Sequence, residues 1–284
     1  MQIGVVFPQT EIGDDPVVIR DFAQTAEGLG FAHVLVYDHV LGADRENRDR
    51  VLTGGYSEKT PFHEVFVLFG YLTGLTSRIE FTTGVLVLPQ RQTALVAKQA
   101  AEIDILSGGR LRLGVGVGWN YVEYEALDED FSNRGRRQEE QVEVMRRLWT
   151  EPVVDFTGKW HRIDRAGILP MPARQIPVWF GGWSPPAYER AARLGDGFII
   201  SANRDPLVGI EAVRAELATL GRDPATFGID VVTPHGTDPG TWASDMETFR
   251  GLGVSHVTLR TMDTGFESIR QHIDAMERYM DAVG

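Results

Sequence analysis

Short apolar runs rich in β-branched residues alternate along this chain with longer segments whose apolar residues recur at helical spacing. The predicted strands are Ile3–Phe7, His33–Tyr37, Ile79–Val87, Leu111–Val117, Val178–Phe180, Gly197–Ile200, Gly228–Val232 and His256–Leu259. The predicted helices are Pro16–Leu29, Glu64–Leu75, Ala94–Leu106, Gln138–Trp149, Pro186–Leu194, Pro206–Leu220, Thr241–Leu252 and Phe266–Ala282. Repeated strand-then-helix units in 284 residues predict an α/β fold, a closed (β/α)8 TIM barrel. A doubly wound sheet is the alternative, but it needs a reversal of strand order that the pattern does not reveal.

Two connections are longer than the minimal repeat requires. Val40–Phe62 follows the second predicted strand, and Pro152–Pro177 separates the fourth predicted helix from the fifth strand. The second connection contains Val153–Trp160, which predicts a small hairpin. Long connections in compact domains are often functional. We therefore treat both as insertions into one barrel domain spanning residues 1–284.

Composition narrows the choice of partners and compartments. The formal net charge of −12 argues against a nucleic-acid partner or an anionic membrane surface. There are no cysteines, so thiolate metal sites and cysteine nucleophiles are excluded. The first residues lack the layout of a signal peptide, and the longest apolar run, Val65–Leu75, is too short to cross a bilayer. These features predict a cytoplasmic protein.

Polar residues collect at the predicted strand ends, where barrel enzymes carry their active sites. Asp38-His39 ends the second strand and is the leading acid–base pair, because histidine exchanges protons near neutral pH and a neighbouring carboxylate biases its tautomer. An aspartate at a strand end can instead simply begin a turn. The position at a barrel mouth favours the catalytic interpretation.

Glycines mark two further strand ends. Gly114, Gly116 and Gly118 share one face of the fourth strand, which usually means that a ligand or another backbone comes close. No helix follows directly, so this is not a dinucleotide fingerprint. Gly181-Gly182 opens toward a helix and suits a phosphate, or is only a tight turn before an N-cap at Ser184.

Other charged residues carry less information. Glu123 can lie at the site or be a solvated helix-start carboxylate, and we favour the second. Arg134–Arg137 can bind an anion or form a solvated helix face, and such runs are usually the latter. The histidines show no metal-ligand spacing, so no metal site is predicted. No Gly-x-Ser-x-Gly elbow supports serine hydrolysis.

Many motifs in one order resemble the luciferase-like monooxygenase superfamily, especially its coenzyme F420-dependent (deazaflavin) oxidoreductases from actinobacteria. The motifs that carry the resemblance are Asp38-His39, Thr82–Pro89, Ala97–Asp104, Ser107–Arg110, Gly114–Asn120, Arg134–Arg137, Gly181–Trp183 and Arg193–Gly197. One departure is Arg91-Gln92-Thr93, where many relatives carry a proline before the helix.

The resemblance implies a cofactor ring across the barrel mouth, near Asp38 and His39 and against a bulge at Gly84–Val85 that often holds a non-proline cis peptide. It implies phosphates against the two glycine motifs, and a role for His39 in assisting hydride transfer or donating a proton. Aromatic residues would wall the pocket: Phe7, Tyr37, Trp119 and Trp183. The catalytic residues expected are His39 and Asp38. The expected cofactor-binding residues are Asp38, His39, Thr83, Gly84, Val85, Gly116, Gly118, Trp119, Gly181, Gly182 and Trp183.

The resemblance thus implies an oxidoreductase that transfers a hydride between coenzyme F420 and a small organic substrate. One alternative is an FMN-dependent monooxygenase on the same barrel, using reduced flavin and O2. Another, of a different class, is a non-catalytic flavin-binding protein. Relatives often dimerise, so a homodimer is the expected assembly.

Overall fold

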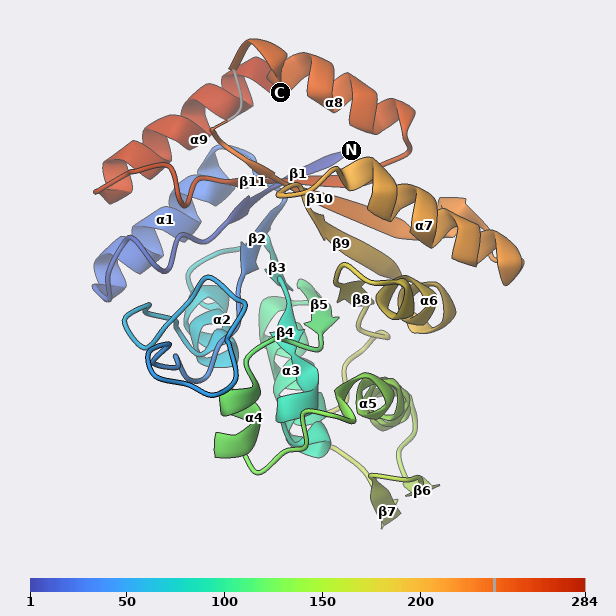
Figure 1. The fold of residues 1–284 in the computed structure, drawn as a ribbon. Coiled ribbons are helices and arrows are strands. Elements are labelled where there is room, and N and C mark those ends of the chain that lie inside the picture. Colours follow the sequence, from blue (N-terminus) through green and yellow to red (C-terminus); the bar gives the residue numbers. More distant parts are fainter. Residues whose placement is uncertain (237–238, 284) are drawn as a thin grey trace.

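Eight parallel strand positions close into a barrel surrounded by helices (Figure 1). The computed structural model describes residues 1–236 and 239–283. The barrel strands are β1 (Gln2–Val6), β2 (His33–Val36), β3 (Glu80–Thr83) with β4 (Leu86–Val87), β5 (Leu111–Gly116), β8 (Val178–Gly181), β9 (Gly197–Ser201), β10 (Gly228–Pro234) and β11 (His256–Arg260). Strand β5 pairs with both β3 and β4, which closes the ring. The predicted fold class is confirmed.

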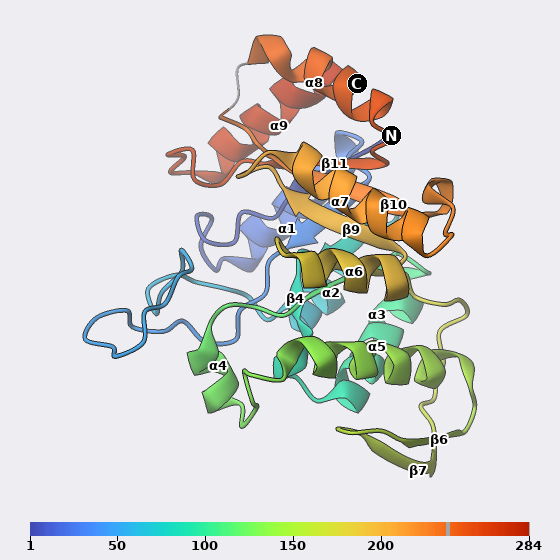
Figure 2. The same ribbon diagram turned by 45° about the vertical axis from the view of Figure 1, so that its right-hand side comes forward.

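The helices follow the strands in the expected alternation. They are α1 (Pro16–Gly28), α2 (Val65–Thr73), α3 (Thr93–Ser107), α5 (Arg134–Thr150), α6 (Pro185–Leu194), α7 (Pro206–Thr219), α8 (Trp242–Gly251) and α9 (Ile269–Val283). The short helix α4 (Tyr121–Ala126) was not predicted. Helix α9 returns beside α1, so the last helix completes the outer layer next to the first (Figures 1 and 2).

The barrel strands are buried on both faces, because helices cover the outside and side chains fill the inside. An apolar layer near the C-terminal strand ends includes Val6, Leu35, Trp179, Ile199, Val232 and Met262. The Trp179 ring fits because Gly197 and Gly228 lack side chains: a Cβ there would lie 2.4 Å and 2.1 Å from ring atoms. Nearer the N-terminal strand ends lies a layer of charged and polar side chains that includes His33, Arg112 and Asp230.

The third barrel strand differs from its prediction. Ile79–Val87 was predicted as one strand, but it is interrupted between β3 and β4 at Gly84–Val85, where the peptide bond is cis. A Cβ on Gly84 would lie 2.1 Å from the Leu35 side chain, so this backbone passes close against β2. The bulge implied by the family resemblance is present.

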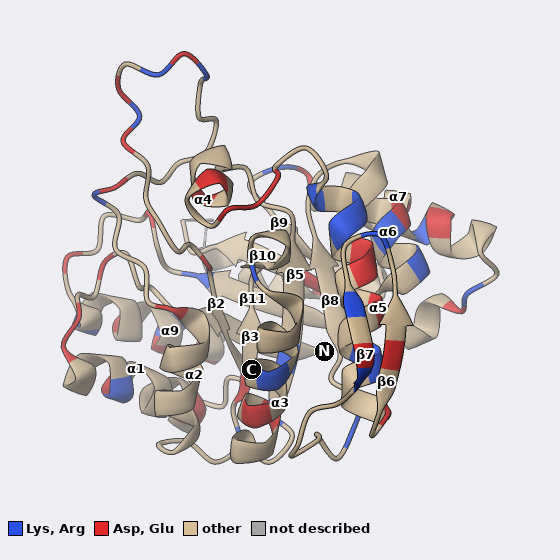
Figure 3. Ribbon diagram, turned by 90° about the horizontal axis from the view of Figure 1, so that it is seen from below, with Lys and Arg blue, Asp and Glu red and all other residues tan. Residues whose placement is uncertain are grey.

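The two insertions take different positions. Strands β6 (Val154–Thr157) and β7 (Arg162–Ala166) form an antiparallel hairpin that projects away from the barrel (Figure 2). The predicted hairpin segment, Val153–Trp160, contains only its first strand and the start of its turn. The insertion between β2 and α2 extends from the barrel near α4 and carries alternating acidic and basic residues (Figure 3). It is anchored on α4, because the Arg50 guanidinium lies 4.4 Å from the Tyr121 ring centroid and the Tyr121 hydroxyl donates to Arg50 O at 3.0 Å.

Helix α5 begins at Arg134, so the Arg134–Arg137 run lies within it, as the helix-face interpretation required. These arginines are not simply solvated. Arg137 is nearly buried and forms an ion pair with Glu129, and the Arg134 guanidinium lies 3.8 Å from the Phe131 ring centroid. Neither of them lines the barrel mouth.

Candidate active site

The C-terminal ends of the barrel strands surround two adjoining cavities of about 370 Å³ each. We call them together the mouth cavity. Its His39 half is lined by Asp38, His39, Tyr56, Val87, Asn203 and Arg260 in addition to the shared residues. Its glycine half is lined by Gly116, Val117, Gly181, Gly182, Ser184, Ala187, Ile199 and Val232 in addition to them. The shared residues are Tyr37, Gly84, Val85, Gly118, Trp119, Trp183 and Ser201.

His39 is held by a carboxylate that the sequence did not assign to it. Its Nδ1 lies 3.0 Å from Oε2 of Glu123, a side chain only 1% exposed. The other Glu123 oxygen accepts hydrogen bonds from the amides of Val40 and Leu41, at 2.7 Å and 3.1 Å. With Glu123 ionised, Nδ1 carries the proton and donates it, which leaves Nε2 as the nitrogen available for proton exchange.

The expectation that Glu123 is a solvated helix-start residue was therefore wrong. Asn120 starts helix α4 as its N-cap, accepting from Val122 N at 3.1 Å, and its amide donates to Leu41 O at 3.1 Å. The first bond fixes the start of the helix that carries Glu123, and the second joins that helix start to Leu41, so Glu123 lies against the segment that follows His39. The Asn-x-x-Glu spacing of 120–123 matches the capping-box pattern and was the available signal for this helix.

Asp38 has partners other than His39. Its carboxylate accepts from Val87 N at 2.9 Å and from the Arg91 guanidinium at 2.7 Å, so it ties β4 to the end of β2. Burial lowers the pKa of Arg91, but the Asp38 and Glu64 carboxylates outweigh burial and hold it above its ordinary value. The carboxylate that orients His39 is therefore Glu123 and not the adjacent Asp38. A catalytic role for Asp38 stays a prediction.

Aromatic rings enclose His39. The ring centroids of Tyr56, Phe62 and Trp119 lie 5.4, 4.9 and 5.5 Å from that of His39. Tyr56 comes from the β2–α2 insertion, and Gly54 lies against Trp119 so closely that a Cβ would be 2.0 Å from the indole. The insertion thus contributes one wall of the site and limits the access of water to His39.

The glycines in and directly after β5 are explained by close neighbours from residues 83–87, a backbone oxygen at Gly114 and valine side chains at Gly116 and Gly118. A Cβ on Gly114 would lie 1.9 Å from Thr83 O, and one on Gly116 would lie 2.3 Å from Val85 Cγ2. Gly118 has a φ of +61°, and a Cβ there would lie 2.7 Å from Val87 Cγ1. The bare face therefore receives β3 and β4. Gly116 and Gly118 still border the mouth cavity, where their backbone is accessible to a ligand.

The Gly181–Ser184 turn supplies amide groups without help from the helix that follows. Pro185 and Pro186 have no N–H, and Ala187 N donates to Ser184 O at 2.8 Å. Among the hydrogen bonds of the described residues, none uses the amides of Gly182, Trp183 and Ser184. These loop amides, together with the Ser184 hydroxyl, are the donors that an anion in the glycine half would meet.

Thr83, a predicted cofactor-binding residue, and Phe7, a predicted wall of the pocket, do not line the mouth cavity. All the other predicted cofactor-binding residues line it. Thr83 is fully buried, and its hydroxyl donates to Gly114 O at 2.6 Å, so it joins β3 to β5. Phe7 belongs to the core around the barrel, 5.4 Å from Phe22 between ring centroids. The expected role of Phe7 as a pocket wall was wrong, whereas Tyr37, Trp119 and Trp183 do line the cavity.

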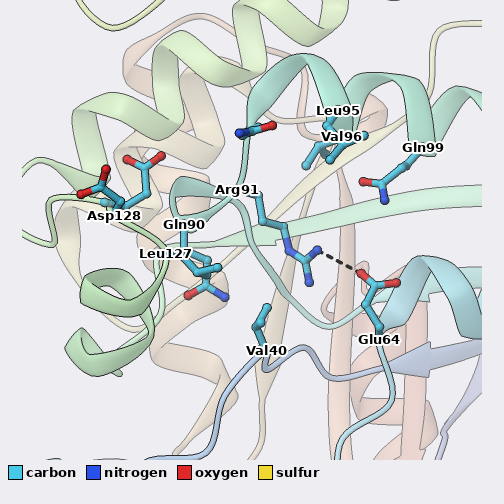
Figure 4. A pocket seen from close by; sticks show the side chains of 11 residues that line it. Val40, Glu64, Gln90, Arg91, Leu95, Val96, Gln99, Leu127 and Asp128 are labelled. Atoms are coloured by element: carbon cyan, nitrogen blue, oxygen red, sulfur yellow. Dashed lines mark hydrogen bonds and ion pairs between the residues drawn. The ribbon is translucent and has the colours of Figure 1, made fainter.

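A separate cavity of about 450 Å³ lies outside the barrel, between the starts of α2 and α3 and the segment after α4. Arg91 and Glu64 both line this cavity, and Figure 4 shows the Arg91 guanidinium pointing toward the Glu64 carboxylate. Arg91 Nη1 lies 3.0 Å from Glu64 Oε1. Arg91 thus connects the outer face to Asp38 at the barrel mouth. None of the residues lining this outer cavity also lines the mouth cavity.

Within the described part of the chain, no three histidine or acidic side chains are grouped so that they could hold a metal ion. No helix there is long and apolar enough to span a membrane.

Comparisons with known proteins agree with this architecture. A family model described as "Luciferase-like monooxygenase" matches residues 1–237. The chain belongs to the luciferase-like monooxygenase family.

Relatives with different activities resemble the chain about equally. An F420-dependent glucose-6-phosphate dehydrogenase of Segniliparus rotundus is 31% identical over 80% of this chain and 67% of its own length. The pyrimidine monooxygenase RutA of a Bradyrhizobium strain is 31% identical over 79% of this chain and 62% of its own length. A solved F420-dependent secondary alcohol dehydrogenase, in complex with an F420–acetone adduct, superposes with a TM-score of 0.78 over 100% of this chain and 99% of that one. Its 20% identity supports the fold alone.

Proposed function

We propose that this chain is an oxidoreductase that transfers a hydride between coenzyme F420 and a small organic substrate. The observation that carries the proposal is the His39–Glu123 pair beside an apolar cavity. A hydride transfer that interconverts an alcohol and a carbonyl moves one proton as well, and a histidine with one free ring nitrogen is suited to that proton. The F420-dependent relative from Segniliparus rotundus supports the choice of carrier.

The residues present fit a phosphate-bearing tricyclic cofactor. Gly116 and Gly118 leave backbone open to the glycine half, and the unused amides of residues 182–184 offer donors for a phosphate. Trp119 and Trp183 provide apolar walls on both halves. When bound, the deazaflavin supplies or accepts the hydride.

The protein's own contribution is proton handling and exclusion of water. In the direction of carbonyl reduction, His39 donates its Nε2 proton to the substrate oxygen; in the direction of alcohol oxidation, Nε2 accepts the hydroxyl proton. Glu123 holds the ring through Nδ1 and stabilises the imidazolium. The aromatic residues around His39 limit its exchange of protons with bulk water.

An FMN-dependent monooxygenase is the second candidate. The monooxygenase activity is supported by the RutA relative, whose identity to this chain is the same as that of the F420-dependent relative. The use of FMN is supported by an FMNH2-dependent dimethylsulfone monooxygenase of Pseudomonas fluorescens, which is 29% identical over 70% of this chain. The glycine half would serve an FMN phosphate equally well, since its donors are backbone amides.

Binding of the two carriers tests the proposal. The purified protein is titrated with F420, FMN and NADPH, each in oxidised and reduced form, and we expect the tightest binding for F420. Protein loaded with F420 is then offered a panel of secondary alcohols and ketones, with the absorbance of the deazaflavin as the readout. Absence of F420 binding would contradict the proposal, and tighter binding of reduced FMN with substrate-dependent O2 uptake would favour the monooxygenase. Tight binding without any substrate-dependent redox change would indicate a flavin-binding protein.

A further inference from the structure

One cation faces the mouth cavity. Arg260, the last residue of β11, lines the His39 half, and the described residues that line either half include no other lysine or arginine. Its side chain is 15% exposed, so its charge lies largely out of bulk water. A partly buried guanidinium at a cavity wall is a strong site for a carboxylate or a phosphate.

The groups around Arg260 on the cavity side are hydrogen-bond donors. Its Nη2 donates to Asn203 Oδ1 at 3.0 Å, which leaves the Asn203 amide nitrogen to donate elsewhere. Ser201 and Tyr37 add hydroxyl groups to the same wall. Burial raises the pKa of Tyr37 well above its ordinary value and the pKa of Tyr56 to about 12, so both phenols are protonated at neutral pH.

Neither Asp38 nor Glu123, the carboxylates around His39, forms an ion pair with this cation. Asp38 is bound by Arg91 and Val87 N, and Glu123 is bound by His39 and two backbone amides. Arg260 forms an ion pair with Asp263, whose carboxylate lies 3.5 Å away on a side chain that is 61% exposed, and Glu11 interacts with Arg260 over a longer distance. The Asp263 contact is long and solvated, and such pairs contribute little. The net charge of −12 repels anions in general, so a local cation is needed wherever one binds.

Arg260 and the Gly181–Ser184 turn border different parts of the mouth cavity. Gly181, Gly182 and Ser184 line only the glycine half, whereas Arg260 lines only the His39 half, together with His39. An anionic group at the Gly181-Gly182 amides and a second one at Arg260 would therefore occupy different halves of the mouth cavity. The first position suits the phosphate of the cofactor, and the second suits a group on the substrate.

We propose that Arg260, with Asn203 and Ser201, binds a carboxylate or phosphate group of the substrate and so orients its reacting carbon toward His39. The substrate class is then a small alcohol or carbonyl compound with an anionic substituent. This proposal rests on the proposed function for the identity of the reaction, but the anion site itself can be measured without turnover.

The test compares Arg260→Gln and Arg260→Lys with Arg270→Gln, a control on the exposed surface of α9. Each protein is titrated with inorganic phosphate and with acetate, followed by tryptophan fluorescence, since Trp119 and Trp183 line the cavity. We expect saturable binding in the wild type and in Arg270→Gln, at least tenfold weaker binding in Arg260→Gln, and an intermediate value in Arg260→Lys. No saturable binding to the wild type, or equal binding to Arg260→Gln, overturns the proposal.

A second arm separates the substrate from the cofactor as the source of the anion. The dissociation constants of F420 and FMN are measured for the same proteins, and we expect Arg260→Gln to leave both within about twofold. A tenfold or larger loss of cofactor affinity in Arg260→Gln assigns the anionic group to the cofactor and overturns the substrate proposal. If neither carrier binds the wild type, the proposed function fails, while the phosphate titration still decides the anion site. Circular dichroism confirms that each variant is folded, and Arg260→Lys serves if Arg260→Gln is not.

Discussion

Two buried histidines at opposite ends of the barrel use similar partners for different purposes. At the mouth, His39 is bound through Nδ1 to Glu123, and its ring lines a cavity. At the N-terminal end of the strands, which we call the floor of the barrel, His33 is fully buried. Its Nε2 lies 2.7 Å from Thr258 Oγ1 and 3.2 Å from Asp230 Oδ2. A histidine–carboxylate pair can do chemistry only where one ring nitrogen remains accessible to a substrate.

The floor network is built for stability. Asp230 also accepts from Thr258 Oγ1 at 2.7 Å and from Arg112 Nη1 at 3.2 Å. Burial raises the pKa of Asp230, but the nearby His33 and Arg112 outweigh it, and the pKa falls well below its ordinary value. Asp230 is therefore ionised in the folded protein, and its removal leaves buried Arg112 with Glu80, 2.7 Å from its Nε, as the remaining ion-pair partner and takes the carboxylate away from His33. The His39–Glu123 pair should tolerate loss of the histidine better, because Glu123 keeps its hydrogen bonds from the amides of Val40 and Leu41.

His39→Ala should give the largest effect. We expect turnover with any substrate found for the F420-loaded protein to fall by about 10²–10⁴-fold, because the proton donor and acceptor is lost. The stability should change little, since the ring lies at a cavity wall. Steady-state kinetics and urea unfolding measure the two. His63→Ala, which changes a histidine outside the mouth cavity, is the matched control; unchanged turnover in His39→Ala would remove the proton role from this residue.

Asp230→Ala should instead lower the free energy of unfolding and leave cofactor binding nearly unchanged. Removing one member of a buried charge network costs about 3–5 kcal/mol, so the free energy of unfolding should fall by that amount. Cofactor affinity should remain close to that of the wild type in the folded fraction. Asp164→Ala, on the exposed hairpin, should change stability by less than about 0.5 kcal/mol. A small effect of Asp230→Ala would show that the floor does not depend on this network.

Glu123→Gln should have a smaller effect on turnover than loss of the histidine. The ring keeps a hydrogen-bond partner but loses the charge that stabilises the imidazolium, which corresponds to about 1.5–3 kcal/mol for a charged hydrogen bond and so about 10- to 100-fold. The pH profile of kcat distinguishes this positioning role from a structural one, because the acidic limb should move to lower pH. An unshifted profile with intact turnover would argue that Glu123 only anchors helix α4.

The stability of the folded protein should also depend on pH. Burial and the charge of Arg112 lower the pKa of His256 to about 3, and burial and the neighbouring His235 lower that of His272 to about 4. Since both lie below the ordinary value of 6.5, the unfolded chain binds protons more readily than the folded one. Their stabilisation is complete above about pH 6.5 and is lost progressively as the pH falls toward 4 and 3. Urea unfolding between pH 8 and 4 measures this, and His256→Gln should make the dependence shallower; a flat curve in the wild type would contradict it.

Most of the fold could be predicted from local patterns. The strand-then-helix alternation located every barrel strand, because parallel strands buried on both faces appear as uninterrupted apolar runs. The interruption at Gly84–Val85 could not be read from periodicity, since apolar residues continue through it. Helix α4 was missed because it is short and its apolar face is built against the β2–α2 insertion.

The site could be predicted only in part. Strand ends identified His39 and the glycine motifs, because a closed barrel brings all C-terminal strand ends to one mouth. The pairing of His39 with Glu123 could not be predicted, since the two residues are far apart in sequence and meet through contacts of Asn120 and Leu41. Tyr56 was missed because it lies in an insertion with no regular pattern.

The sequence by itself determined the barrel, the position of its mouth and the presence of a histidine there. It did so because hydrophobic periodicity and the connection of strands to helices are local properties of the chain. The tertiary structure alone decided which carboxylate holds that histidine, that β3 and β4 fill the bare face of β5, and that Arg260 faces the same cavity. Those outcomes depend on long-range packing, in which residues distant in sequence compete for the same partners.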